Sequence, residues 1–270
     1  MTRVGLCTIA FKATPIEEVI SIAADAGASC LELWGQPPHV AYPIDNGALE
    51  ALGQNAQSKA VPIVVFGSYF QPGKDVVYDG IEVTVENQVA AAASVGAKLI
   101  RIWAASKDLN EASTDERQRW YGEMRRFADA AGAEGIDTVL ERHSGTLTHG
   151  WDAPTEVLAE IDHPRVFLNY QIAYPMPVGD YSRRCIDDYT RLLPLSRHAH
   201  IQNYIETPAG PLKRTLLDRG VVDYSKLGVA CREADYRGCL MIEFPADIRG
   251  GMNAVAAVAA DIAYLGALDT

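Results

Sequence analysis

Short apolar runs rich in valine, isoleucine and leucine alternate along the chain with longer amphipathic segments. Runs of five or six such residues are typical of strands buried on both faces, and the longer segments between them are typical of helices. The pattern predicts eight strands, at residues 3–8, 29–34, 62–67, 99–103, 137–141, 166–171, 199–203 and 239–243.

Two of the expected helices begin with recognisable start signals. Ser113 is followed by Glu116 three residues later. Thr14 is followed by Pro15 and, again three residues on, by Glu17. This spacing is typical of a capping box, in which side chains bond the free amide groups of the first helical turn. The sequence therefore predicts that helices begin directly after Ser113 and Thr14.

Eight strand–helix units without a break in composition favour one (β/α)8 TIM barrel spanning residues 1–270. The alternative is an open, doubly wound sheet. It is weakened because neither GxGxxG nor GxxxxGK[ST] follows any predicted strand. In a barrel the active site lies at the carboxyl ends of the strands, so the residues that close each run are the candidates for chemistry.

The charge balance narrows the choice of partners. The chain carries 24 Lys+Arg against 35 Asp+Glu, a formal charge of -11, and contains no basic run, which argues against a nucleic-acid partner. No apolar stretch reaches the roughly 20 residues that span a bilayer, so we expect no membrane association and a cytoplasmic location. The five cysteines are odd in number and lack CxxC spacing, which favours buried free thiols.

Polar and aromatic side chains close most of the predicted strands. They are Glu32 and Trp34, Arg101 and Trp103, Glu141 and His143, Gln171, His200 and Gln202, and Glu243. Side chains alternate along a strand, so Glu141 and His143 share one face. Two carboxylates and an imidazole from the fifth, seventh and eighth strands would converge on the barrel axis. This set suits Mn²⁺, Mg²⁺ or Co²⁺ and, less distinctively, Zn²⁺.

Each of these residues also has a structural interpretation. Glu243 can be a salt-bridged strand end, and His200 can be a core histidine. Arg101 can pair with Glu32 rather than with a substrate anion, and the two tryptophans can be packing at the barrel mouth. Four consecutive strand ends carrying Glu, Gln, His and Glu are nevertheless unusual for structural reasons alone, and the joint pattern favours a functional site.

At these residues the chain resembles the xylose-isomerase-like TIM barrel superfamily. "DTVLERHSGTLT" at 137–148, "HAHIQN" at 198–203 and the stretch 222–244 are similar to motifs of its fifth, seventh and eighth strands. The group includes sugar isomerases, ketose 3-epimerases, hydroxypyruvate isomerases, inosose and dehydroshikimate dehydratases, and an endonuclease IV branch. The acidic charge and only six histidines oppose the last of these.

The resemblance implies a divalent cation, with Mn²⁺ expected first and Mg²⁺, Co²⁺ or Zn²⁺ as alternatives. Its implied ligands are Glu141, Gln171, His200 and Glu243, while His198 is assigned to support. The chain departs from the family pattern at three points. Gln171 stands where relatives have an aspartate, Tyr174 stands where they have a histidine, and Gln202 with Asn203 replaces a Lys-Asp pair.

The leading expectation is a metal-dependent isomerase or epimerase of a small sugar or keto-sugar, acting through a metal-bound enediolate. Glu141 and Glu243 would remove and return the proton, with His143 as a further acid or base. The residues expected to contact substrate are Trp34, Trp103, Arg101, Glu32, Gln202 and Tyr174.

Two alternatives remain open at this point. The first is a lyase, either a dehydratase or an enzyme that cleaves oxidised C-glycosides, in which His143 becomes the stronger candidate for the base. The second is a degenerate sugar-binding barrel without catalysis, whose metal site is weakened at Gln171. The resemblance also implies a homo-oligomer, although no segment of the sequence indicates which helices would pair.

Overall fold

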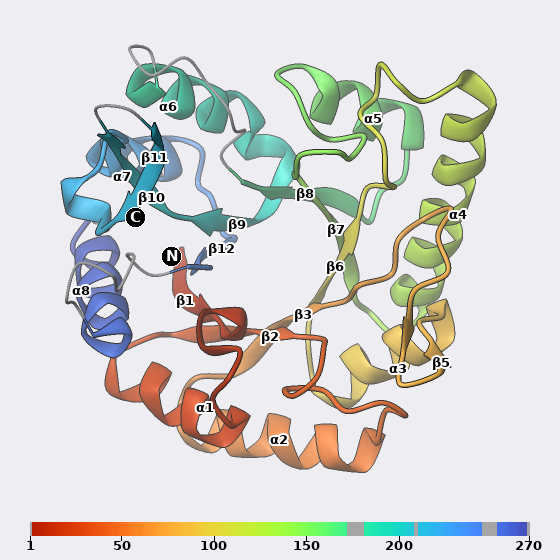
Figure 1. The fold of residues 1–270 in the computed structure, drawn as a ribbon, viewed down its shortest axis with the longest axis horizontal. Coiled ribbons are helices and arrows are strands. Elements are labelled where there is room, and N and C mark those ends of the chain that lie inside the picture. Colours follow the sequence, from red (N-terminus) through yellow and green to blue (C-terminus); the bar gives the residue numbers. More distant parts are fainter. Residues whose placement is uncertain (1, 172–180, 208–209, 245–252, 269–270) are drawn as a thin grey trace.

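The computed structural model describes residues 2–171, 181–207, 210–244 and 253–268. Within these ranges eight parallel strands close into a barrel, and Figure 1 shows helices surrounding it. The barrel strands are, in chain order, β1 (Arg3–Cys7), β2 (Cys30–Trp34), β3 (Ile63–Gly67), β6 (Leu99–Trp103), β7 (Asp137–Glu141), β8 (Val166–Tyr170), β9 (Ser196–Ile201) and β12 (Cys239–Ile242). The closed sheet confirms the predicted (β/α)8 barrel and excludes the open sheet.

One helix follows each barrel strand. The helices are α1 (Ile16–Asp25), α2 (Asn46–Ser58), α3 (Val85–Ser94), α4 (Thr114–Ala133), α5 (Ala153–Ile161), α6 (Tyr181–Leu192), α7 (Tyr224–Glu233) and α8 (Ala254–Gly266). The described residues also contain three short 3-10 helices between strands and helices: η1 (Thr8–Phe11), η3 (Leu193–Leu195) and η4 (Leu217–Arg219). In the described ranges, none of the helices has both the length and the apolar character needed to cross a membrane.

The two predicted helix starts have different outcomes. Ser113 caps α4 as expected, because its Oγ accepts from the amide of Glu116 and the Glu116 carboxylate accepts from the amide of Ser113 at 2.9 Å. The prediction for Thr14 is wrong: α1 begins at Ile16, and no side chain caps it. Pro15 has an extended backbone with ψ of 139°, so the first helical turn can form only after it.

Parallel register brings the strand ends to one rim of the barrel. Trp103 lies opposite Glu141, and Glu141 lies opposite Asn169 on the next strand. The barrel closes where β1 lies between β2 and β12, which places Cys7 opposite Glu32. Because the strands all point the same way, residues at their carboxyl ends meet at this rim although they are far apart in sequence.

A small apolar cluster fills the barrel below that rim. Its buried members are Cys30, Val64, Val65, Cys239 and Met241. Cys30 and Glu32 lie two residues apart on β2 and share a face, so the cluster lies one layer below the polar side chains. All five cysteines lie within the described residues; they are buried, as predicted, and none of them forms a disulfide.

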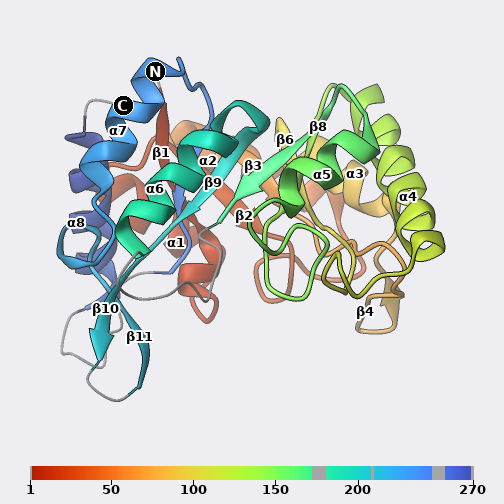
Figure 2. The ribbon, with the colours of Figure 1, turned by 90° about the horizontal axis from the view of Figure 1, so that it is seen from above.

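Two antiparallel hairpins are inserted after barrel strands. One is formed by β4 (Val77–Tyr78) and β5 (Ile81–Glu82) after β3, and the other by β10 (Asn203–Thr207) and β11 (Gly210–Thr215) after β9. Figure 2 shows both hairpins extending from the same side of the barrel. They therefore flank the rim at which the barrel strands end.

Candidate functional site

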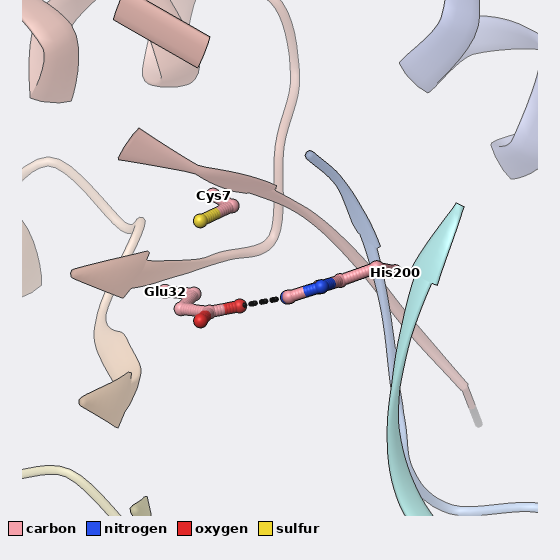
Figure 3. A group of neighbouring side chains, drawn as sticks. All are labelled: Cys7, Glu32 and His200. Atoms are coloured by element: carbon pink, nitrogen blue, oxygen red, sulfur yellow. Dashed lines mark hydrogen bonds and ion pairs between the residues drawn. The ribbon is translucent and has the colours of Figure 1, made fainter. Parts of the chain in front are cut away.

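Glu32 is fully buried and organises the centre of the rim. Its Oε2 lies 2.7 Å from Nε2 of both His198 and His200, and its Oε1 accepts from Nε of Arg101 at 2.7 Å. Figure 3 shows Glu32 and His200 facing each other. Arg101 also forms a buried ion pair with Glu141. The ion pair between Arg101 and Glu32, considered from the sequence, is confirmed.

Glu141, His200 and Glu243 form a second group on the other side of the His200 ring. Nδ1 of His200 lies 3.9 Å from Oε1 of Glu141 and 3.6 Å from Oε1 of Glu243. All three side chains are buried, and one potential ligand atom from each lies within 4.8 Å of the other two. Since Nε2 is bonded to Glu32, Nδ1 is the nitrogen that faces the two carboxylates. The fold thus brings together three of the four predicted ligands.

Gln171, the fourth predicted ligand, lies directly after β8 beside this group. Its Nε2 donates to Oε2 of Glu243 at 3.0 Å. Its Oε1 and the Oδ1 of Asn169 are buried and have no hydrogen-bond partner within the described part of the chain. A buried amide oxygen without a partner costs free energy, which a bound cation would recover. Carboxylate, imidazole and amide oxygen together fit a divalent metal ion.

The charges at the rim shift the pKa values of its members. Burial disfavours the charged form of His200, but the carboxylates of Glu32 and Glu243 outweigh this and raise its pKa to about 9. Burial alone would raise the pKa of Glu32, yet His200, Arg101 and His198 hold it well below its usual range. Burial raises the pKa of Glu243. A cation entering here would displace the His200 proton, so metal binding should release protons.

Cys7, Glu32 and His200 form an inner group whose potential ligand atoms are also close together (Figure 3). Burial, followed by the charge of Glu32, raises the pKa of the Cys7 thiol well above its usual value. A protonated thiol is a poor metal ligand, and both oxygens of Glu32 already accept hydrogen bonds from Arg101 and the histidines. The outer group of Glu141, His200 and Glu243 is therefore better suited to a cation.

A glycine at the end of β3 makes room for the buried ion pair. A Cβ atom on Gly67 would lie 2.8 Å from Nη2 of Arg101 and 3.0 Å from Oε1 of Glu32. Real Cβ atoms essentially never approach other atoms more closely than 3.0 Å. A side chain at this position would therefore push Arg101 away from its partners.

A cavity of about 370 Å³ opens next to the strand ends. Among its lining residues are Tyr69, Lys74, Tyr78, Trp103, His143 and Thr146. Two predicted site residues, Trp103 and His143, thus line the cavity. Trp34 is nearly buried, and its Nε1 donates to the hydroxyl of Tyr69 at 2.8 Å, so it supports a cavity residue.

The contacts of His143 select one tautomer of its neutral ring. Nδ1 lies 2.9 Å from the carbonyl oxygen of Ser144, and the ring meets Trp103 edge-on with centroids 4.8 Å apart. A carbonyl oxygen only accepts hydrogen bonds, so Nδ1 carries the hydrogen of the neutral ring. The lone pair then belongs to Nε2.

The other predicted contact residues are more constrained. Oε1 of Gln202 accepts from Nε of Arg214 at 3.1 Å, and its backbone carbonyl accepts from the hydroxyl of Tyr224. Glu32 and Arg101 are buried by their mutual contacts. A direct substrate contact by any of these three residues stays a prediction. Tyr174 lies outside the described residues.

Sequence reasoning did not identify Tyr69 and Lys74, because it named no candidate at or beyond the end of the third predicted strand, residues 62–67. A signal was present in the spacing. Tyr69 lies two residues beyond Gly67, just as His143 lies two residues beyond Glu141. Side-chain alternation beyond Gly67 indicates Tyr69, whereas the place of Lys74 depends on the conformation of the following loop.

Together, the closed barrel and the strand-end acids and histidines define a TIM barrel with a candidate metal centre. Residues 20–268 match the family described as xylose isomerase-like TIM barrel, and the chain belongs to this family. A solved member of the same description from Mycobacterium smegmatis, in complex with magnesium, has a TM-score of 0.71 and 18% identity, covering 100% of this chain and 97% of its own. Members of the fold family therefore bind divalent metals.

A curated relative, 3-dehydroshikimate dehydratase of Bacillus anthracis, is 23% identical over 203 residues, which are 74% of this chain and 71% of the relative. The crystal structure of the probable 3-DHS dehydratase AsbF from Bacillus anthracis has a TM-score of 0.77 and 22% identity, covering 98% of this chain and 99% of its own. The structure of an L-ribulose 3-epimerase has a TM-score of 0.73 and 16% identity, covering 100% and 95%.

These findings correct the expected reaction class. From the sequence alone we expect isomerase or epimerase activity ahead of lyase activity, and that order is wrong: the curated relative is a dehydratase, and the L-ribulose 3-epimerase is more distant in sequence. The physical reason for the error is that both reactions begin in the same way: a proton leaves the carbon next to a carbonyl, and a metal ion stabilises the resulting negative charge. What happens after proton removal depends on the leaving group of the substrate, which strand-end residues do not encode.

Proposed function

We propose that this chain is a divalent-metal-dependent lyase that eliminates water from a small polyhydroxylated ketone, with 3-dehydroshikimate as the first compound to test. The dehydratase activity of the curated relative supports the reaction class. The buried acids and histidine at the rim, and the cavity beside them, support the chemistry.

The proposed metal ligands are Glu141, Gln171, His200 and Glu243. When bound, a divalent cation supplies Lewis acidity that stabilises negative charge on a substrate carbonyl oxygen. Glu32 acts through His200, because its hydrogen bond to Nε2 orients the ring and leaves Nδ1 toward the carboxylates. Mn²⁺ is the metal we expect first, ahead of Mg²⁺, Co²⁺ and Zn²⁺.

His143 is the proposed general base, and its hydrogen bond to Ser144 is the observation that carries the proposal. With hydrogen on Nδ1, the neutral ring has its lone pair on Nε2 and can accept a proton from the carbon next to the carbonyl. His143 lines the cavity and follows Glu141 by two residues, so it lies beside the proposed metal ligands. Trp103 packs against its ring and restricts its rotation.

His143 can also return the proton that it removes. The proton removed from carbon resides on His143 and can be returned to the hydroxyl group that leaves, so that water departs and the imidazole ends neutral. Tyr69 supplies a hydrogen bond to a substrate oxygen. Its hydroxyl accepts from Trp34, and burial raises its pKa to about 12, so it keeps its hydrogen at neutral pH.

The test begins with metal analysis of the purified protein. Metal-loaded protein is then incubated with 3-dehydroshikimate, inososes and keto-glycosides while ultraviolet absorbance is followed for a new conjugated product. We expect product from 3-dehydroshikimate. Exchange of solvent deuterium into recovered ketose without elimination would contradict the proposal. A protein that neither contains nor regains stoichiometric metal would favour the degenerate sugar-binding barrel.

The role of His143 is tested with His143→Asn. We expect the elimination rate to fall by about 10²–10⁴-fold, the usual contribution of a general base, with metal content unchanged. His163→Asn is the matched control, because His163 bonds Asp129 and lies just before β8, at the opposite end of the barrel. An active His143→Asn variant would remove His143 from the mechanism. A homo-oligomer and a cytoplasmic location remain predictions from the sequence.

A further inference from the structure

Lys74 supplies a positive charge to the cavity beside the proposed base. Of the described residues that line this cavity, Lys74 has the one permanent positive charge, and none is acidic. Tyr69, Tyr78 and Thr146 offer hydroxyl groups on the same walls. The chain as a whole carries a formal charge of -11, so an anion entering here depends on a local cation.

The turn that carries Lys74 is firmly anchored. The amide of Lys74 donates to the carbonyl of Gln71 at 3.1 Å across Pro72 and Gly73. Gly73 has φ of +74°, and proline followed by a glycine with positive φ is typical of a type II turn. Gln71 in turn donates from Nε2 to the carbonyl of Ala105, just beyond β6.

Contacts with α4 hold the same turn from outside. The amide of Gly73 donates to the carboxylate of Glu123 at 2.8 Å. A Cβ atom on Gly73 would lie 2.0 Å from Nε1 of Trp120, so the turn is in close contact with the helix and needs a glycine there. The position of Lys74 at the cavity is therefore set by backbone hydrogen bonds and close packing.

We infer that Lys74 selects substrates bearing a carboxylate, which it would bind in the cavity while the ketone end reaches the proposed metal ligands. This inference rests on the proposed function, because His143 is assigned as the base of the same cavity. A lysine is a compact point charge and tolerates a carboxylate in several orientations. Neutral polyhydroxylated ketones of similar size would lack this contact and bind more weakly.

Equilibrium binding tests the inference without requiring turnover. Calorimetry on metal-loaded protein compares shikimate, a cyclic polyhydroxy carboxylate, with its uncharged methyl ester. We expect Lys74→Gln to weaken shikimate binding by about tenfold and to leave the ester unchanged. Lys98→Gln, which removes the same charge just before β6 at the far end of the barrel, should leave both affinities unchanged.

Three results would overturn the inference: equal losses for the acid and the ester, no loss for the acid, or failure of the acid to bind the unaltered protein. Failure of the proposed function can be told apart. If shikimate binds in a way that depends on Lys74 but 3-dehydroshikimate is not turned over, the dehydratase proposal fails and the role of Lys74 stands. If 3-dehydroshikimate is turned over but Lys74→Gln leaves the affinity for shikimate unchanged, only the role of Lys74 fails.

Discussion

Gln171 donates from Nε2 to Oε2 of Glu243 at 3.0 Å, while its own Oε1 is buried without a partner among the described residues. The hydrogen bond orients the amide, and the orientation leaves its oxygen available. A neutral amide oxygen is a weaker metal ligand than a carboxylate. Because Gln171 is uncharged, a divalent cation would face two formal negative charges, from Glu141 and Glu243, instead of three.

Replacing Gln171 should raise or lower the affinity for metal, depending on whether the new side chain is a metal ligand. We expect Gln171→Asp to bind Mn²⁺ at least about tenfold more tightly, because a third carboxylate joins the ligands. Gln171→Leu should bind at least about tenfold more weakly, a loss within the range seen when metal-site groups are removed. Titration calorimetry measures both, with Gln118→Leu on the exposed face of α4 as control. Equal affinities for all variants would show that Gln171 is not a ligand.

Glu243→Gln should abolish turnover while largely preserving the fold. The substitution keeps the size of the side chain but removes one of the two negative charges that face Nδ1 of His200. We expect a loss of rate of more than about 10³-fold with a circular dichroism spectrum like that of the parent protein. An active variant with a full complement of metal would disprove the role of Glu243.

Arg101→Met should strongly destabilise the fold. Without the guanidinium, the buried carboxylates of Glu32 and Glu141 lose the cation between them. Breaking a buried ion pair by removing one partner costs about 3–5 kcal/mol. Urea denaturation measures the loss. Arg237→Met, which removes an exposed ion pair to Asp235, should cost less than about 1 kcal/mol. Similar losses for the two variants would contradict the prediction.

Asp261 should make stability depend on pH below neutrality. It lies in α8, is almost completely buried, and accepts from the amide of Leu217 at 2.8 Å. Burial raises its pKa from 3.8 to about 6. The folded state therefore keeps the proton to a higher pH than the unfolded state, so this residue costs stability progressively as pH rises from about 4 to about 6.

The matched variant is Asp261→Asn, which cannot ionise and retains an oxygen for the Leu217 amide. Relative to this variant, the parent protein should lose about 2–3 kcal/mol of unfolding free energy between pH 4 and pH 7, since each pKa unit is worth about 1.4 kcal/mol. Denaturant titrations at each pH measure the gap, with Asp25→Asn on α1 as the exposed baseline. A gap that is constant with pH would contradict the prediction.

Local patterns in the sequence determined the architecture. Short apolar runs marked all eight barrel strands, and the capping box at Ser113 marked the start of α4. The convergence of Glu141, His200 and Glu243 also followed from the sequence, because the carboxyl ends of parallel strands share one rim. These features depend on side-chain alternation and strand direction, which neighbouring residues specify.

Contacts between distant residues were decided by the tertiary structure. Glu32 meets His200 across 168 positions of sequence only because β1 closes the barrel between β2 and β12. Lys74 reaches the cavity because its turn packs against α4. The start of α1 at Ile16 followed from the backbone of Pro15 rather than from the Thr14 motif. Sequence patterns report which face of an element is buried, whereas the partner of each buried charge is set by closure, register and loop packing.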